Sequence, residues 1–170
     1  MDTAEQDVVG LVEYAGGRLT DRMEGLSDDE WAWQPIAGDA EVTVRWRLDH
    51  VVEVLTASRN REWLGLAPST GPMPGTPTTA AEALAGLGTA IRVFLAAATE
   101  VGDSASEPMG AVAGPYAEST KRSFVLHVAD ELIHHGAEAA LLRDLYAARP
   151  GRSSRTTETA SVASDAGYPQ

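Results

Sequence analysis

Side chains that could bind a metal are concentrated in one short segment, HVADELIHHGAE, residues 127–138. It holds three of the four histidines in the chain. Imidazole nitrogens and carboxylate oxygens are common ligands of zinc and other divalent metals. Because the chain has no cysteine, a metal site must use nitrogen and oxygen, and any nucleophilic sulfur must come from another molecule.

Helical spacing divides this segment into two competing sets of ligands. His127, Glu131 and His135 are four residues apart, which places them on one slowly drifting stripe, because four residues turn a helix by about 400°. His134 and Glu138 form a second pair at the same spacing, about 100° farther round. Only one of the two sets can face the centre of a bundle.

The apolar periodicity indicates which set faces inward. The predicted core side of this helix consists of Phe124, Val128, Glu131, Leu132, His135, Ala139 and Leu142. A carboxylate and an imidazole in such positions cost several kcal/mol unless they are paired or bind a cation. Since His50 is the remaining histidine, we predict a metal site of His50, Glu131 and His135 with open coordination positions, as in catalytic sites.

Ordinary structural roles remain open for the same side chains. Glu131 could instead form an ion pair with an arginine, and the two histidines could be hydrogen-bonded residues of a partly buried surface. The arginines considered for this pairing are Arg45, Arg47 and Arg122. His134 could be a solvated partner of a neighbouring carboxylate.

Four amphipathic helices are predicted to position these residues. Apolar residues recur at three- and four-residue steps over residues 3–24, 42–63, 79–101 and 119–148. Ser27–Glu30 and Thr79–Glu82 read as capping boxes that open a short turn and the third helix. Helices of this length span about 30–45 Å and favour an all-α four-helix bundle.

The connection between the second and third helices bears on the order of the bundle. Residues 65–78, GLAPSTGPMPGTPT, are too rich in proline and glycine to continue a helix. These fourteen residues can reach about 46 Å, the full length of the bundle. We therefore expect an up-down-down-up bundle over residues 1–148. Residues 149–170 have no apolar period and are predicted to be a disordered polar tail.

Charge and hydropathy exclude several classes of partner. The chain has 25 acidic and 13 basic residues, a formal charge of −12, which repels nucleic acids and anionic membranes. The acidic N-terminus does not resemble a signal peptide, and no 18-residue stretch is uninterruptedly apolar. We expect a cytoplasmic protein with neither nucleic acid nor membrane as a partner.

The segments TVRWRLDHVVEVL, RNREWLGL and HVADELIHHGAEAALLRDLY resemble the DinB-like superfamily of metal-binding four-helix bundles, over nearly all of residues 1–148. That family places one histidine ligand on the second helix and two ligands four residues apart on the fourth. The corresponding residues here are His50, Glu131 and His135. Most members have histidine where this chain has Glu131. The His/Glu/His set is similar to the mycothiol-dependent maleylpyruvate isomerase branch of high-GC actinobacteria, in which the metal is zinc.

The resemblance implies a divalent-metal-dependent thiol transferase in which mycothiol reacts with a small electrophile as a metal-bound thiolate. The extra C-terminal domain of the full-length isomerases is not expected in this chain. Trp31, Trp33, Arg45 and Arg47 are predicted to line the mouth of the site and to hold a polar cofactor. The superfamily also implies a homodimer.

Two other functions remain open at this point. The metal could activate water for hydrolysis, with His134 or Glu138 as the general base. Alternatively, the protein could be a metal-binding stress protein without turnover. Packing in the core or at its rim is the alternative role for the four tryptophans.

Overall fold

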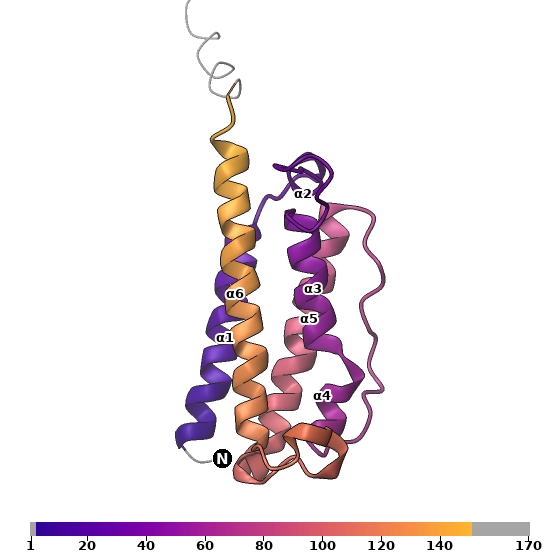
Figure 1. The fold of residues 1–170 in the computed structure, drawn as a ribbon, viewed down its shortest axis with the longest axis vertical. Helices are drawn as coiled ribbons and strands as arrows, with labels where there is room; N and C mark the ends of the chain where they lie inside the picture. Colours follow the sequence, from indigo (N-terminus) through magenta and orange to yellow (C-terminus); the bar gives the residue numbers. More distant parts are fainter. Residues whose placement is uncertain (1–2, 151–170) are drawn as a thin grey trace, which may run out of the picture.

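The computed structural model describes residues 3–150, and this part of the chain is helical, as the sequence predicts (Figure 1). The four long helices are α1 (Thr3–Met23), α3 (Val44–Thr56), α5 (Ala80–Val101) and α6 (Lys121–Ala147). Shorter elements are α2 (Asp28–Trp31), α4 (Ser58–Trp63) and the 3-10 helices η1 (Gly102–Ser106) and η2 (Ala111–Tyr116). Residues 151–170 of the predicted tail lie outside the described part.

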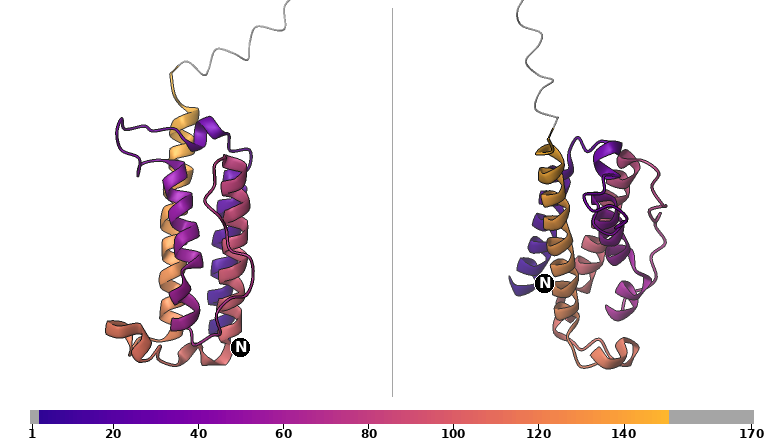
Figure 2. Two further views of the ribbon diagram at one scale, coloured as in Figure 1. Left: turned by 90° about the vertical axis from the view of Figure 1, so that its right-hand side faces the viewer. Right: turned by 45° about the horizontal axis from the view of Figure 1, so that its top comes forward.

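Each long helix packs against two others. α3 packs against α5 and α6, and α1 packs against the same two helices. In Figure 1, α1 and α6 ascend while α3 and α5 descend. Residues 64–79 return along the outside of the bundle, as Figure 2 shows, so α3 and α5 run in the same direction. The antiparallel packing of α3 on α6 brings His50 opposite the histidine-rich segment.

The second predicted helix is interrupted, so the single helix expected over residues 42–63 is wrong. Ala57 has φ −53° and ψ 131°, an extended conformation between α3 and α4. The side-chain amide of the buried Asn60 donates hydrogen bonds to the carbonyls of Val54 and Leu55, at 2.8 and 3.2 Å. These bonds satisfy carbonyl groups that the end of α3 would otherwise leave without partners, which stabilises the break.

Both predicted capping signals start helices. The Ser27 hydroxyl accepts from the backbone N–H of Glu30 at 3.3 Å, and Thr79 accepts from that of Glu82 at 3.2 Å. The Glu82 carboxylate accepts from the backbone N–H and the hydroxyl of Thr78, both at 2.7 Å, one residue earlier than in a standard capping box. These hydrogen bonds from Thr78 lower the pKa of Glu82.

The apolar helix α5 forms the back of the core. By length and composition, Ala80–Ser106 is the one helix within residues 3–150 that could cross a membrane, with a mean hydropathy of 1.4. Its Leu87, Ala90 and Phe94 are buried in the core, and the helix packs against α1 and α3. The core helix of a bundle has the same composition, which accounts for the hydropathy without a membrane.

Candidate metal centre

Two histidines and one carboxylate converge between α3 and α6 at mid-height in the bundle. The Nε2 atom of His50 lies 3.6 Å from Oε2 of Glu131, and Nε2 of His135 lies 3.3 Å from the same oxygen. One candidate ligand atom from each residue lies within 4.8 Å of the other two. The structure therefore brings together the three residues predicted as ligands, on the two antiparallel helices that contact each other.

The separations of these atoms fit a shared cation better than direct pairing. Two ligand atoms about 2.1 Å from one tetrahedral ion lie about 3.4 Å apart, close to the 3.6 and 3.3 Å found here. Neither imidazole is hydrogen-bonded to Glu131 within the described residues. All three residues are partly buried, with side-chain exposures of 29% for His50 and Glu131 and 12% for His135. The donor set is thus suited to a small divalent ion.

Trp46 supports both imidazole rings, a role that the sequence analysis missed. Its ring stacks on His50, with centroids 5.0 Å apart and planes 10° apart, and meets His135 edge-on at 5.9 Å. The signal in the sequence was the four-residue step from Trp46 to His50, which places both rings on one face of α3. Stacking holds the His50 ring and covers one side of the cluster.

Glu138 fixes the orientation of His135. Its Oε2 lies 2.8 Å from Nδ1 of His135, and because a carboxylate has no proton to give, Nδ1 donates. In the neutral imidazole this tautomer leaves the lone pair on Nε2, which faces Glu131 at 3.3 Å. Such carboxylate–histidine pairs are common behind metal-binding imidazoles. The guanidinium of Arg47 lies 3.0 Å from the same Glu138 oxygen, an ion pair whose Nε–H is not aligned for a hydrogen bond.

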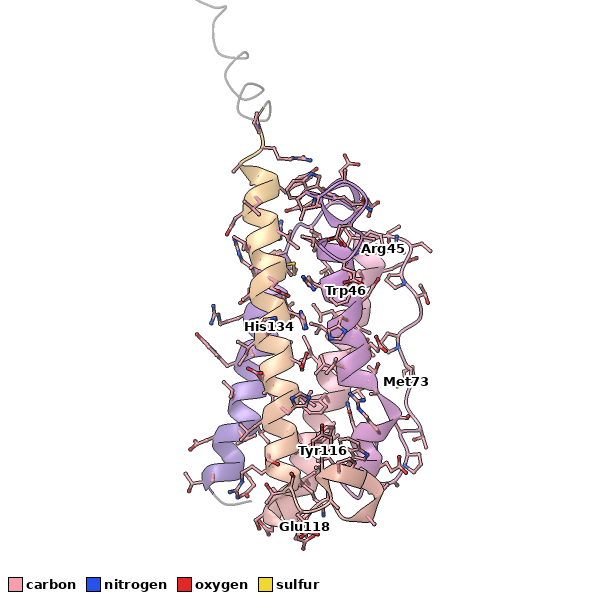
Figure 3. The ribbon with its side chains drawn as sticks, viewed as in Figure 1. Arg45, Trp46, Met73, Tyr116, Glu118 and His134 are labelled. Carbon is pink, nitrogen blue, oxygen red and sulfur yellow. The ribbon has the colours of Figure 1, made fainter. Side chains whose placement is uncertain are left out.

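A second group of metal-binding side chains, His134, His135 and Glu138, overlaps the first. His134 is 62% exposed, lies 3.5 Å from Glu138, and points away from α3 in Figure 3. Glu138 already neutralises Arg47, whose charge opposes a cation at this position. The group formed by His50, Glu131 and His135 has no arginine among its contacts in the described residues and is the better candidate.

The arginines expected as alternative partners of Glu131 pair with other carboxylates. Arg45 lies 3.8 Å from Asp49, Arg47 contacts Glu138, and Arg122 pairs with Glu5. Burial raises the pKa of Asp49, and the charge of Arg45 opposes this rise. In residues 3–150, Glu131 therefore has only imidazoles as ionisable partners.

Of the four residues predicted at the mouth of the site, Trp31, Trp33 and Arg45 lie at the α2 end of the bundle, whereas Arg47 pairs with Glu138. Trp31 is buried, with the Arg45 guanidinium 4.7 Å from its ring centroid. Trp33 meets Tyr146 edge-on at 5.5 Å, and Arg149 lies over its ring. In Figure 3, Arg45 lies above Trp46, toward the α2 end of the bundle, and its half-exposed guanidinium packs on the buried Trp31.

Comparison with known proteins identifies one family. A family model described as the DinB superfamily matches residues 11–139, which include α3, α5 and the three candidate ligands. No curated protein and no solved structure matches the chain.

Proposed function

Because the chain belongs to the DinB superfamily, we propose that it is a divalent-metal-dependent enzyme in which His50, Glu131 and His135 hold the ion. The observation that carries this proposal is the convergence of two Nε2 atoms and one carboxylate oxygen without hydrogen bonds between them. The spacing and the nitrogen-rich donor set favour zinc. When bound, the ion would supply a Lewis acid that lowers the pKa of a thiol.

The proposed reaction is transfer of a small external thiol, such as mycothiol, to an electrophile. A new bond forms between the thiol sulfur and the electrophilic carbon, the leaving group departs with its bonding electrons, and the thiol proton passes to solvent. An external thiol is required because the protein has no cysteine.

The neighbouring side chains have defined tasks in this proposal. Glu138 keeps the proton of His135 on Nδ1, and Trp46 restrains His50 and excludes water from one side. We propose that the half-exposed Arg45 and Trp33 contact a polar cofactor. Trp31 packs beneath Arg45, and Arg47 pairs with Glu138.

The test is a conjugation assay with mycothiol and a haloalkane or bimane. We expect zinc-loaded protein to accelerate conjugation at pH 7 and to lose the effect in His50→Ala and after chelation. The advantage should shrink above about pH 9, where a free thiol with a pKa of about 8.5 is itself largely ionised. His134→Ala, a histidine on the same helix that points away from α3, is the matched control.

No acceleration at pH 7 with metal fully bound would exclude the transferase. A hydrolase is less favoured because neither proposed base is free beside the cluster: Glu138 is held by Arg47 and His135, and His134 points away. Metal retention without turnover on thiols or esters would leave a metal-binding protein.

We also propose a cytoplasmic homodimer. Large apolar side chains remain exposed on α1 and α6, including Tyr14 at 64%, Leu141 at 59% and Ile133 at 44%. Exposed apolar patches of this kind are typical of interaction surfaces. Analytical ultracentrifugation should give a dimer that Leu141→Glu converts to a monomer; a monomeric wild-type protein would exclude this assembly.

A further inference from the structure

A separate cavity of about 370 Å³ opens between α4, η2 and α6. Its lining includes Arg59, Trp63, Tyr116, Ser123, Phe124 and His127. His127 was predicted on the stripe of Glu131 and His135, but it lines this cavity instead of joining the cluster between α3 and α6. This volume lies in the range of sites for small organic molecules.

Three aromatic rings form the apolar part of the cavity. The Trp63 ring lies 5.1 Å from Phe124 and 6.0 Å from Tyr116 between centroids. Phe124 is buried and forms the floor, whereas Tyr116 is 57% exposed at the lower end of the bundle in Figure 3. Rings tilted against one another around an open space can stack on a planar ligand or meet its edge.

The polar part of the cavity favours an anion. The chain carries a net charge of −12, yet none of the residues that line this cavity is acidic. Arg59 lies over the Trp63 ring, 5.7 Å from its centroid, and no carboxylate of residues 3–150 lies within ion-pair distance of its guanidinium. By contrast, the nearby Arg61 pairs with Glu100 and Lys121 pairs with Glu107. Arg59 is therefore free to bind a ligand, beside the imidazole of His127.

We propose that this cavity binds a small planar aromatic carboxylate. The ring would pack against Trp63 and Tyr116 over Phe124, and the carboxylate would accept hydrogen bonds from Arg59 and His127. A guanidinium suits this task because it can donate two parallel hydrogen bonds to one carboxylate. His127 lies one turn along α6 from Glu131, so the ligand would lie next to the candidate metal centre. The inference that aromatic carboxylates are the substrates of that metal centre rests on the proposed function.

The test is calorimetric titration with 2-naphthoate and its neutral analogue 2-naphthylmethanol. We expect naphthoate to saturate one site and to bind about tenfold more weakly to Arg59→Gln, because a charge-assisted hydrogen bond is lost. The neutral analogue should bind wild type about tenfold more weakly than naphthoate does and should not distinguish the variant. Arg18→Gln is the matched control, since Arg18 lies over Tyr14 on α1 in the same way, 5.6 Å from its centroid.

Titrating zinc-free and zinc-loaded protein in parallel separates this proposal from the function of the metal centre. Saturable, Arg59-dependent binding to zinc-free protein supports the cavity even if no thiol transfer is found. Absence of saturable binding, equal affinity of Arg59→Gln, or equal binding of the neutral analogue would overturn it. Trp63→Leu, which keeps the charge and removes the stacking surface, should also weaken binding, and an unchanged affinity would overturn the proposed ring position.

Discussion

Two carboxylates, the buried Glu30 of α2 and the partly buried Glu131 of α6, have opposite surroundings. Arg143 of α6 donates to both oxygens of Glu30, from Nε at 2.8 Å and from a terminal nitrogen at 3.3 Å. The same guanidinium donates to the backbone carbonyl of Glu24 at 3.0 Å. Glu131 has no arginine or lysine partner in the described residues and faces the Nε2 atoms of His50 and His135.

This difference separates a structural carboxylate from a candidate ligand. A bidentate arginine neutralises Glu30 in the folded protein itself and ties α2 to α6. No cationic side chain of the described residues neutralises Glu131, so its charge is available to a bound cation. The neighbouring imidazoles can coordinate the same ion. Charge removal at the two positions should therefore have different consequences.

The largest expected effect is on metal binding. His50→Ala, Glu131→Ala and His135→Ala should each lose more than about 100-fold in metal affinity, because each removes a direct ligand. Glu30→Ala should keep the metal. Elemental analysis of purified proteins measures this, and equal occupancy in His135→Ala and wild type would refute the ligand set. A greater loss in His134→Ala would move the site to the overlapping group.

Stability should show the reverse pattern. Glu30→Ala leaves the mostly buried Arg143 without its carboxylate and should lower the free energy of unfolding by about 3 kcal/mol. In metal-free protein, Glu131→Ala should cost less than about 1 kcal/mol, since its partners need not be charged. Urea unfolding of both variants after chelation checks this. Equal losses would mean that Glu131 is a structural residue as well.

Substitution of Glu138 should have an intermediate effect on metal binding, because Glu138 orients the ligand His135 and also pairs with Arg47. Glu138→Gln should weaken metal binding by about 10-fold without abolishing it, as expected for a residue behind a ligand. The amide can still accept the Nδ1 proton of His135, so Glu138→Ala should be worse than Glu138→Gln. Competition with a chelating dye gives both affinities. A complete loss in Glu138→Gln would make Glu138 a ligand instead.

The smallest expected effect is at Asp49, a carboxylate that is only weakly paired. Burial raises its pKa against the opposing charge of Arg45. The folded protein then binds this proton more tightly than the unfolded chain, so the ionised carboxylate lowers stability at neutral pH. Asp49→Asn should raise stability at pH 7 by at most about 0.5 kcal/mol, since the side chain is 41% exposed. The gain should vanish as the pH falls below about 4, and a gain that persists at pH 3 would rule out this cause.

Local patterns in the sequence were enough to predict the long helices and much of the metal-binding cluster. The three- and four-residue periodicity predicted α1, α5 and α6 to within about two residues, and Ser27 and Thr79 marked two helix starts, because these signals act within one or two turns. The step from Glu131 to His135 likewise put both side chains on one face of α6. The break at Ala57 was missed, since the amide that stabilises it belongs to Asn60, beyond the break.

The sequence by itself determined which side chains could bind a metal, because a chain without cysteine and with four histidines offers few choices. Tertiary structure alone decided how they are used. The packing of α3 against α6 placed Trp46 edge-on to His135 and brought Arg47 and Glu138 together as an ion pair. The packing of α4 and η2 against α6 placed His127 in a separate cavity. Residues in these groups are up to about ninety positions apart, and no local period encodes which arginine neutralises which carboxylate; that depends on distances across the bundle.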